Sequence, residues 1–113
     1  MLDVLSEMEF NREAINRAYA TVEALFNDLH MNEDTYKVIE DLFVQCSKDF
    51  EWCDPTVSMI DNMFYLASKV IRERYPNAKV SYHVSRISPS RSDIDVDNET
   101  YRIADEEFAK EFE

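Results

Sequence analysis

The sequence predicts an α+β domain that is mostly α, with three N-terminal helices, a short strand or β-hairpin, and a C-terminal helix. Apolar residues recur at spacings of three and four as far as Pro76, which is the period of amphipathic helices, and the spacing then changes to two, as in a half-buried strand. With 113 residues, of which 45% are hydrophobic, the chain can bury one core. No linker divides it, so residues 1–113 are expected to form a single acidic domain.

The first helix is expected to begin near Ser6 or Asn11 and to end around His30. Ser6 and Glu9 have the spacing of a capping box, in which the two side chains satisfy free backbone N–H groups at a helix start. A stripe at helical spacing follows, comprising Ile15, Ala18, Tyr19, Val22, Leu25, Phe26 and Leu29.

Asn32 can cap a second helix, because its side-chain oxygen can accept from the first backbone N–H groups. The apolar face expected for this helix comprises Tyr36, Ile39, Leu42, Phe43 and Cys46. Asp54 and Pro55 then form an N-cap and first-turn pair that opens a third helix, and Pro76 closes it.

The third helix carries two adjoining apolar stripes that cover about half of its circumference. The first comprises Val57, Ile60, Phe64, Ala67 and Ile71. The second comprises Met59, Met63, Leu66 and Val70. A helix covered in this way is either central in its own domain or half-buried in a partner. The second stripe is therefore a candidate oligomer interface, with a homodimer as its simplest form.

Beyond Pro76, Val80, Tyr82 and Val84 alternate with polar residues, which predicts a strand. Ile94 and Val96 alternate with aspartates, so an antiparallel partner strand can form. A last helix is expected after Asn98, with an apolar face of Tyr101, Ala104, Phe108 and Phe112.

The chain contains no glycine. Phosphate-binding loops, dinucleotide fingerprints and nucleophile elbows need glycine, because their backbone approaches the ligand closely or adopts positive φ. These classes of nucleotide-binding and catalytic site are therefore excluded. Helix ends and turns are expected to use Asn, Asp, Ser and the three prolines instead.

The formal net charge is −12, yet residues 69–92 hold six bases and one acid. Acids at helix starts and bases at helix ends follow from the helix dipole and explain part of this pattern. The dipole does not explain like-charged residues four apart, which destabilise a helix by a few tenths of a kcal/mol. These pairs are Asp3 with Glu7, Glu9 with Glu13, and Glu107 with Glu111. Their presence indicates that negative charge is favoured at these positions.

Carboxylates on one helical face stand roughly 5–6 Å apart, close to the spacing of phosphates along a nucleic-acid strand. In size, charge and helicity the chain is similar to the small acidic DNA-mimic inhibitors encoded by bacteriophages and mobile elements. That similarity implies a rigid acidic surface that occupies the basic groove of a DNA-binding protein. The expected partner-binding residues are Asp3, Glu7, Glu9, Glu13, Glu33, Asp34, Glu40 and Asp41.

The leading hypothesis is a non-enzymatic acidic module that sequesters or inhibits a protein partner with a basic or nucleic-acid-binding surface. One alternative is a solvated acidic surface that only keeps the protein in solution. Another is a small helical adaptor or dimeric regulator that binds through the second stripe of the third helix. Direct nucleic-acid binding by residues 72–91, which interleave bases with aromatics, is disfavoured because the acidic body repels the phosphate backbone.

The residues that could hold a metal do not form a recognised motif. Cys46 and Cys53 are seven apart, and His30 and His83 are isolated, so free thiols and no zinc are expected. Asp93, Asp95 and Asp97 resemble the start of a calcium loop, but Asn98 replaces the required glycine and Ala104 replaces the bidentate ligand.

No catalytic residues and no cofactor are expected, because no nucleophile lies in a recognised motif. No segment approaches the roughly 20 apolar residues of a membrane span, and the start MLDVLSEMEF lacks the features of a signal peptide. The sequence thus predicts a cytoplasmic protein.

Overall fold

The computed structural model describes residues 11–46 and 55–112. Along the chain it contains helices α2 (Arg12–Asp28), α3 (Asp34–Cys46) and α4 (Pro55–Arg74), strand β1 (Val80–His83), the 3-10 turn η1 (Pro89–Arg91), strand β2 (Asp93–Val96) and helix α5 (Asn98–Lys110). The predicted class is confirmed: the protein is mostly helical, with an antiparallel hairpin followed by a C-terminal helix. No helix in the described ranges combines the length and apolarity of a membrane span.

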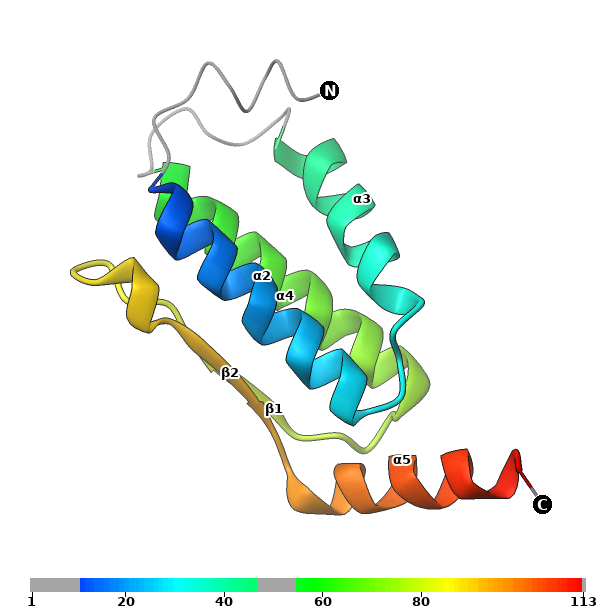
Figure 1. Ribbon diagram of the computed structural model, residues 1–113. Helices are drawn as coiled ribbons and strands as arrows, with labels where there is room; N and C mark the ends of the chain where they lie inside the picture. Colours follow the sequence, from blue (N-terminus) through cyan, green and yellow to red (C-terminus); the bar gives the residue numbers. More distant parts are fainter. Residues whose placement is uncertain (1–10, 47–54, 113) are drawn as a thin grey trace.

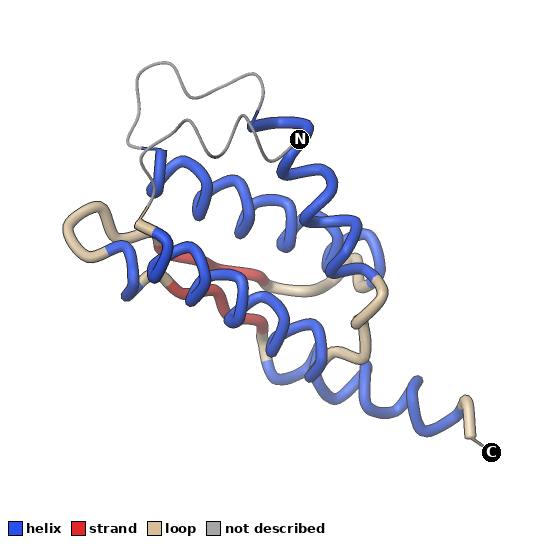
Figure 2. Tube along the Cα trace, turned by 45° about the horizontal axis from the view of Figure 1, so that its top comes forward, coloured by secondary structure: helices blue, strands red, loops and turns tan. Residues whose placement is uncertain are grey.

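Helices α2 and α4 lie side by side and run in the same direction, whereas α3 runs back alongside them (Figure 1). Two hydrogen bonds hold the parallel pair at its ends. The backbone N–H of Asn11 donates to Oγ1 of Thr56 at 2.8 Å, and the hydroxyl of Tyr75 donates to the carbonyl of Leu29 at 3.4 Å. The hairpin lies across α2 and α4 on the side away from α3, and α5 leaves from the end of the hairpin (Figures 1 and 2).

The core lies mainly where α2 and α4 meet. Phe26 of α2 and Phe64 of α4 are the largest fully buried side chains. The stripe predicted for the first helix is buried from Ala18 onward, except that Tyr19 is half-buried. Burying large apolar side chains contributes roughly 1.5–3 kcal/mol each, so the packing of α2 on α4 contributes substantially to the fold's stability.

Both stripes of α4 belong to this core, except that Val57 of the first stripe is only half-buried. The second stripe, Met59, Met63, Leu66 and Val70, is buried within a single chain. The view of these residues as an oligomer interface is therefore corrected: they pack inside the domain and are not presented to a second copy. The reason is that α4 is the central helix, with α2, α3 and the hairpin all packed around it.

Helix α2 ends in a Schellman motif without glycine. The backbone N–H of Met31 donates to the carbonyl of Phe26 at 2.8 Å, and that of His30 donates to the carbonyl of Asn27 at 3.1 Å. His30 adopts the left-handed φ of 58° that this motif requires. The expectation that Asn, Asp, Ser and Pro would serve at the helix ends is thus wrong here. Phe26 and Met31 are both buried, which supplies the apolar contact typical of the motif.

The buried face of α3 differs from the predicted one. Val38 and Leu42 are fully buried, Ile39 is half-buried, and Tyr36 is 77% exposed. Val38 and Leu42 stand four residues apart and so share one face of the helix, while Tyr36, two positions before Val38, points to another side. Phe43 and Cys46 belong to the predicted face too, but their side chains lie outside the described part of the chain.

The hairpin pairs Val80 with Val96 and Tyr82 with Ile94. Ile94 and Val96 are buried, whereas Val80 is half-buried and Tyr82 is exposed. The predicted alternation is confirmed on β2, whose aspartates face solvent. On β1 it is only partly present, although the ring of Tyr82 still meets the edge of Phe64 with centroids 6.0 Å apart.

Candidate acidic binding site

The carboxylates predicted to bind a partner fall into three groups. Glu13, Glu33 and Glu40 are exposed, and Asp34 and Asp41 are half-buried. Asp3, Glu7 and Glu9 lie outside the described residues. The exposed members remain available to a partner in solution.

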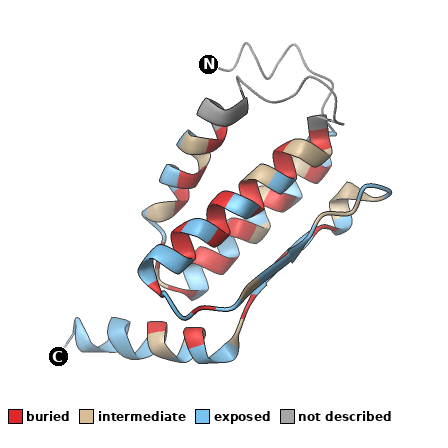
Figure 3. Cartoon of the chain, turned by 180° about the vertical axis from the view of Figure 1, so that it is seen from behind, coloured by how far each residue is buried: buried red, intermediate tan, exposed pale blue. Residues whose placement is uncertain are grey.

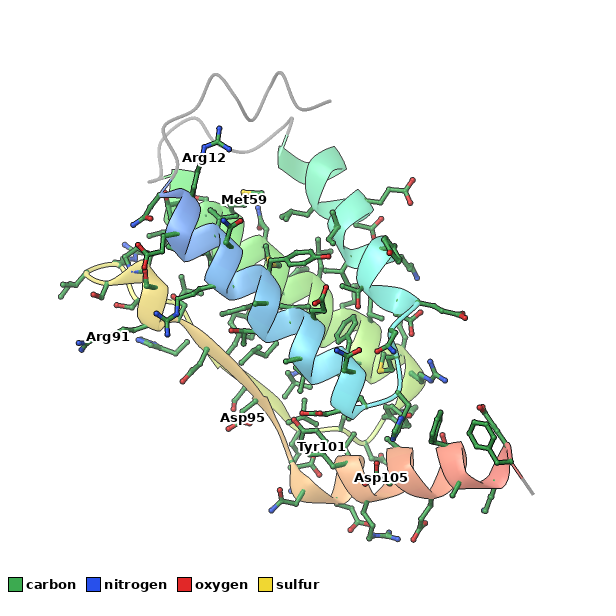
Figure 4. All side chains as sticks on the ribbon, viewed as in Figure 1. Arg12, Met59, Arg91, Asp95, Tyr101 and Asp105 are labelled. Atoms are coloured by element: carbon green, nitrogen blue, oxygen red, sulfur yellow. The ribbon has the colours of Figure 1, made fainter. Side chains whose placement is uncertain are left out.

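These residues do not form one patch. Glu13 lies in the first turn of α2, beside the labelled Arg12 in Figure 4, whereas Glu33 and Asp34 follow the far end of the same helix. The 17 residues of α2 separate the two ends by roughly 25 Å at 1.5 Å per residue. A partner that contacted both would have to span the length of the helix bundle.

Asp34 and its neighbours also serve the fold. Nη1 of Arg74 lies 3.2 Å from Oδ2 of Asp34, and Nζ of Lys37 lies 3.5 Å from Oε2 of Glu73. These ion pairs join the start of α3 to the end of α4. Asp34 also stands in the first turn of α3, where the helix dipole favours an acid. Part of its negative charge is therefore already neutralised.

A cleft of about 380 Å³ opens between α5, the turn from α2 to α3, and the end of α4. Its lining residues are His30, Met31, Asn32, Glu33, Arg74, Tyr75, Ala104, Glu107, Phe108 and Glu111. Of the predicted binding residues that the structure describes, only Glu33 lines this cleft.

Helix α5 is fixed at its start. The Asp97 carboxylate accepts a hydrogen bond from the Thr100 hydroxyl at 2.6 Å and another from the backbone N–H of Lys79 at 2.8 Å. These bonds hold the pKa of Asp97 below its ordinary value, because they favour the charged form. Thr100 and Ala104 are the buried residues of this helix. They set the direction in which α5 leaves the hairpin.

Farther along α5, His30 provides the attachment. Its ring stacks on Phe108 with centroids 4.0 Å apart and an interplanar angle of 5°, and its Nε2 lies 2.8 Å from Oδ1 of Asp105. The residues of α5 after Ala104 are all exposed (Figure 3). His30, which follows the end of α2, thus holds the second half of α5 against the helix bundle.

The cleft has an aromatic floor. Tyr75 is buried there and donates its hydroxyl to the carbonyl of Leu29. Burial raises the pKa of Tyr75, and the nearby Glu107 adds to the rise because a negative neighbour disfavours the phenolate, while Arg74 acts in the opposite direction. The hydroxyl therefore stays protonated and neutral at ordinary pH.

The charges on α5 are divided between its two sides. Arg102 pairs with Glu99 and Glu106 on the side away from the cleft. On the cleft side, no ion pair joins Glu107 or Glu111 to a base within the described ranges, and the same is true of Glu33 across the opening. The opening is consequently rimmed by uncompensated carboxylates.

Two aromatic residues extend beyond the cleft. Phe108 is 39% exposed and Phe112 is 76% exposed, and their rings meet edge to face with centroids 4.9 Å apart. The sequence placed both on the apolar face of the last helix. Their rings do lie together, but this end of the chain runs past the helix bundle, so the face is left partly uncovered. The signal that pointed to this region was the like-charged pair Glu107 and Glu111.

No group of three or more His, Cys, Asp or Glu in the described ranges is placed to hold a metal ion. Cys53 lies outside these ranges, as does the side chain of Cys46. His83 stands exposed at the end of β1, far along the chain from the stacked His30.

No family model, no curated protein and no solved structure matches this chain.

Proposed function

We propose that this chain is a non-enzymatic protein-binding module whose acidic surface sequesters or inhibits a partner with a basic surface. In its most specific form it acts as a DNA mimic and occupies the nucleic-acid-binding groove of that partner. Inhibitors of the phage or mobile-element type, acting in the cytoplasm, work on such targets, and the proposal places this chain with them.

The observation that carries the proposal is that most acids in the described ranges face water without a basic partner. Glu13 at one end of α2 and Glu33 and Glu40 on the α3 side have no ion pair there. Unpaired surface carboxylates contribute little to folding, and like charges on one small domain oppose it. They do create the long-range field that attracts a basic protein and speeds encounter.

The rigidity of the surface supports the same proposal. Asn11 caps α2 through a hydrogen bond to the N–H of Ala14, and the pairs Asp34–Arg74 and Lys37–Glu73 fix α3 on α4. Acids on helices held in this way have set positions, so a partner meets a preorganised pattern of negative charge.

The burial of the second stripe of α4 supports the acidic surface over the adaptor alternative. That alternative required the second stripe of α4, and those side chains are packed inside the domain. Binding through the acidic surface does not need them.

The proposal is tested by immobilising the full chain, passing host lysate over it, and identifying what is retained. A retained protein should be released between about 0.1 M and 1 M salt, because the screening length falls from about 10 Å to about 3 Å. Duplex DNA should compete for it if DNA mimicry is the mode of binding. Retention of nucleic acid alone, or of a protein that resists both salt and DNA, would contradict the proposal.

Mutation gives a second test against the retained protein. The Glu13→Gln, Glu40→Gln double variant removes two exposed charges on different helices and should slow association with little change in stability. Tyr65→Ser is a matched control, because it alters an exposed side chain of α4 without changing the charge.

A further inference from the structure

Within the described ranges, the aromatic residues at the far end of α5 are covered only in part: His30 stacks on Phe108, and Phe112 is 76% exposed. Beyond Ala104 the helix reaches past the body, as the turns after Tyr101 and Asp105 show in Figure 4, and Phe108 and Phe112 keep much of their surface in water. Adjacent exposed aromatics next to a cleft mark an interaction site more often than isolated exposed residues do. Any occupant of this face should therefore bring apolar surface.

The same face is negatively charged. Glu107 and Glu111 line the cleft with Glu33 opposite. Among the described residues, Arg74 is the one lysine or arginine that lines it, and it is paired with Asp34 at 3.2 Å. Two like charges four apart on a helix end are unfavourable for the isolated chain, since the helix dipole also favours bases there. A basic group in the cleft would remove both costs.

We propose that the cleft beneath α5 receives a basic segment of the protein partner. An arginine or lysine of that segment lies among Glu33, Glu107 and Glu111, and a neighbouring apolar side chain packs on Phe108 and Phe112. The inference rests on the proposed function and assigns the specific contact within the acidic surface. The acidic residues elsewhere then supply attraction over longer range.

The geometry favours arginine over lysine. His30 covers one face of Phe108, so the open edges of Phe108 and Phe112 remain for the aliphatic part of the incoming side chain. A guanidinium can bind two carboxylates at once through its fork of N–H donors, whereas an ammonium acts as a point charge.

A second copy of this chain is the competing occupant. The tip of its hairpin has matching chemistry, because Arg86 and Arg91 flank Ile87, which is 99% exposed. Each copy nevertheless carries a formal net charge of −12, and two such bodies repel. A basic partner meets no such repulsion, so the structure favours a different protein.

The test measures anisotropy of short fluorescein-labelled peptides titrated with the full chain. The probe is a peptide of alternating Arg and Leu, compared with alternating Arg and Ser and with alternating Glu and Leu. The Arg and Leu peptide should bind most tightly, because it alone supplies both charge and apolar surface. Equal affinity for the Arg and Ser peptide would overturn the apolar half of the site.

Variants then locate the site. Glu107→Gln with Glu111→Gln should weaken binding of the Arg and Leu peptide about fivefold, from two exposed ion pairs. Phe112→Ser should weaken it by a similar factor without affecting the core. The matched control, Asp93→Asn with Asp95→Asn, removes the same charge from the exposed face of β2 and should change affinity less than about twofold.

The remaining outcomes separate this inference from the proposed function. An equal loss of affinity in both double variants would overturn the cleft as the specific binding site. General binding through the acidic surface would remain. The chain alone is also analysed by sedimentation. If it associates with rising concentration, and Ile87→Ser abolishes that association, the cleft binds a second copy, and the proposal of a different protein partner is overturned. Failure of the proposed function alone would give a different result: no basic protein would be retained from lysate, while the Arg and Leu peptide would still bind the cleft.

Discussion

The imidazole of His30 lies parallel to the ring of Phe108, with centroids 4.0 Å apart. His30 is also the left-handed residue that closes α2, so a single side chain joins the end of α2 to the far half of α5. A left-handed conformation is unfavourable for a residue with a Cβ by roughly 1–2 kcal/mol. The stack and the bond to Asp105 help to offset that cost.

The first prediction is that His30→Asn releases α5 and leaves the bundle folded. Asn tolerates left-handed φ, so the Schellman motif should persist, while the stack and the histidine bond to Asp105 are lost. We expect a loss of roughly 1 kcal/mol and faster amide hydrogen exchange in residues 105–110. His83→Asn, at an exposed position, is the control. Unchanged exchange in α5 would show that the stack does not hold the helix.

The second prediction concerns the stripe of α4. Leu66→Asp places an unpaired charge in the core and should abolish folding, because such a group costs several kcal/mol. Tyr65→Asp, one residue earlier and exposed, should fold normally. Circular dichroism with sedimentation distinguishes the two. If Leu66→Asp gave a folded monomer, the second stripe of α4 would not lie in the core.

The third prediction tests which face of α3 is buried. Leu42→Ala should cost about 2–5 kcal/mol, because it leaves a cavity beside α4. Tyr36→Ala should stay within about 0.5 kcal/mol, because its side chain faces water. Urea titration of both variants measures this difference, and the reverse order would restore the face expected from the sequence.

The fourth prediction concerns acid. Hydrogen bonds from Thr100 and from the N–H of Lys79 hold the pKa of Asp97 below its ordinary value of 3.8. The stabilisation is therefore present above about pH 4 and is lost as the pH falls through the lower folded pKa, since the unfolded chain binds the proton first. Asp97→Asn should flatten this part of the curve of unfolding free energy against pH. Asp93→Asn serves as the surface control, and an unaltered curve for Asp97→Asn would argue against the role.

The fifth prediction separates stability from binding at the cleft. Glu107→Gln with Glu111→Gln removes two like charges from the end of α5 and should stabilise the protein by a few tenths of a kcal/mol. Glu99→Gln should act in the opposite direction, because it takes a partner from Arg102. Thermal unfolding of the two variants measures both effects. A destabilised double variant would mean that these glutamates serve the fold rather than a partner.

Several features of the fold could be predicted because they depend on local periodicity. The spacing of Ala18, Val22 and Leu25 in α2 and the double stripe of α4 predict helices with broad apolar faces. The structure buries these residues, except Val57, which is half-buried. The change of period after Pro76 predicts the hairpin, whose strands pair Val80 with Val96. Such patterns depend only on the geometry of the chain itself.

The sequence could anticipate only part of the candidate site. The exposed acids Glu13, Glu33 and Glu40 were visible in the charge pattern, as were Glu107 and Glu111, but nothing in that pattern indicated how far apart they would lie. The cleft joins segments more than 70 residues apart, because Glu33 follows α2 and Glu111 caps the end of α5. Its existence depends on where α5 leaves the hairpin.

The sequence by itself determined that this chain forms amphipathic helices, a hairpin and an acidic exterior. Only the tertiary structure decided that Val38 rather than Tyr36 is buried, that His30 takes the left-handed position, and that Phe108 and Phe112 stay exposed. The physical reason is that periodicity shows which side of an element is apolar, whereas burial requires a neighbour to cover that side. Helix α5 extends past its neighbours, so its aromatic residues remain open to a partner.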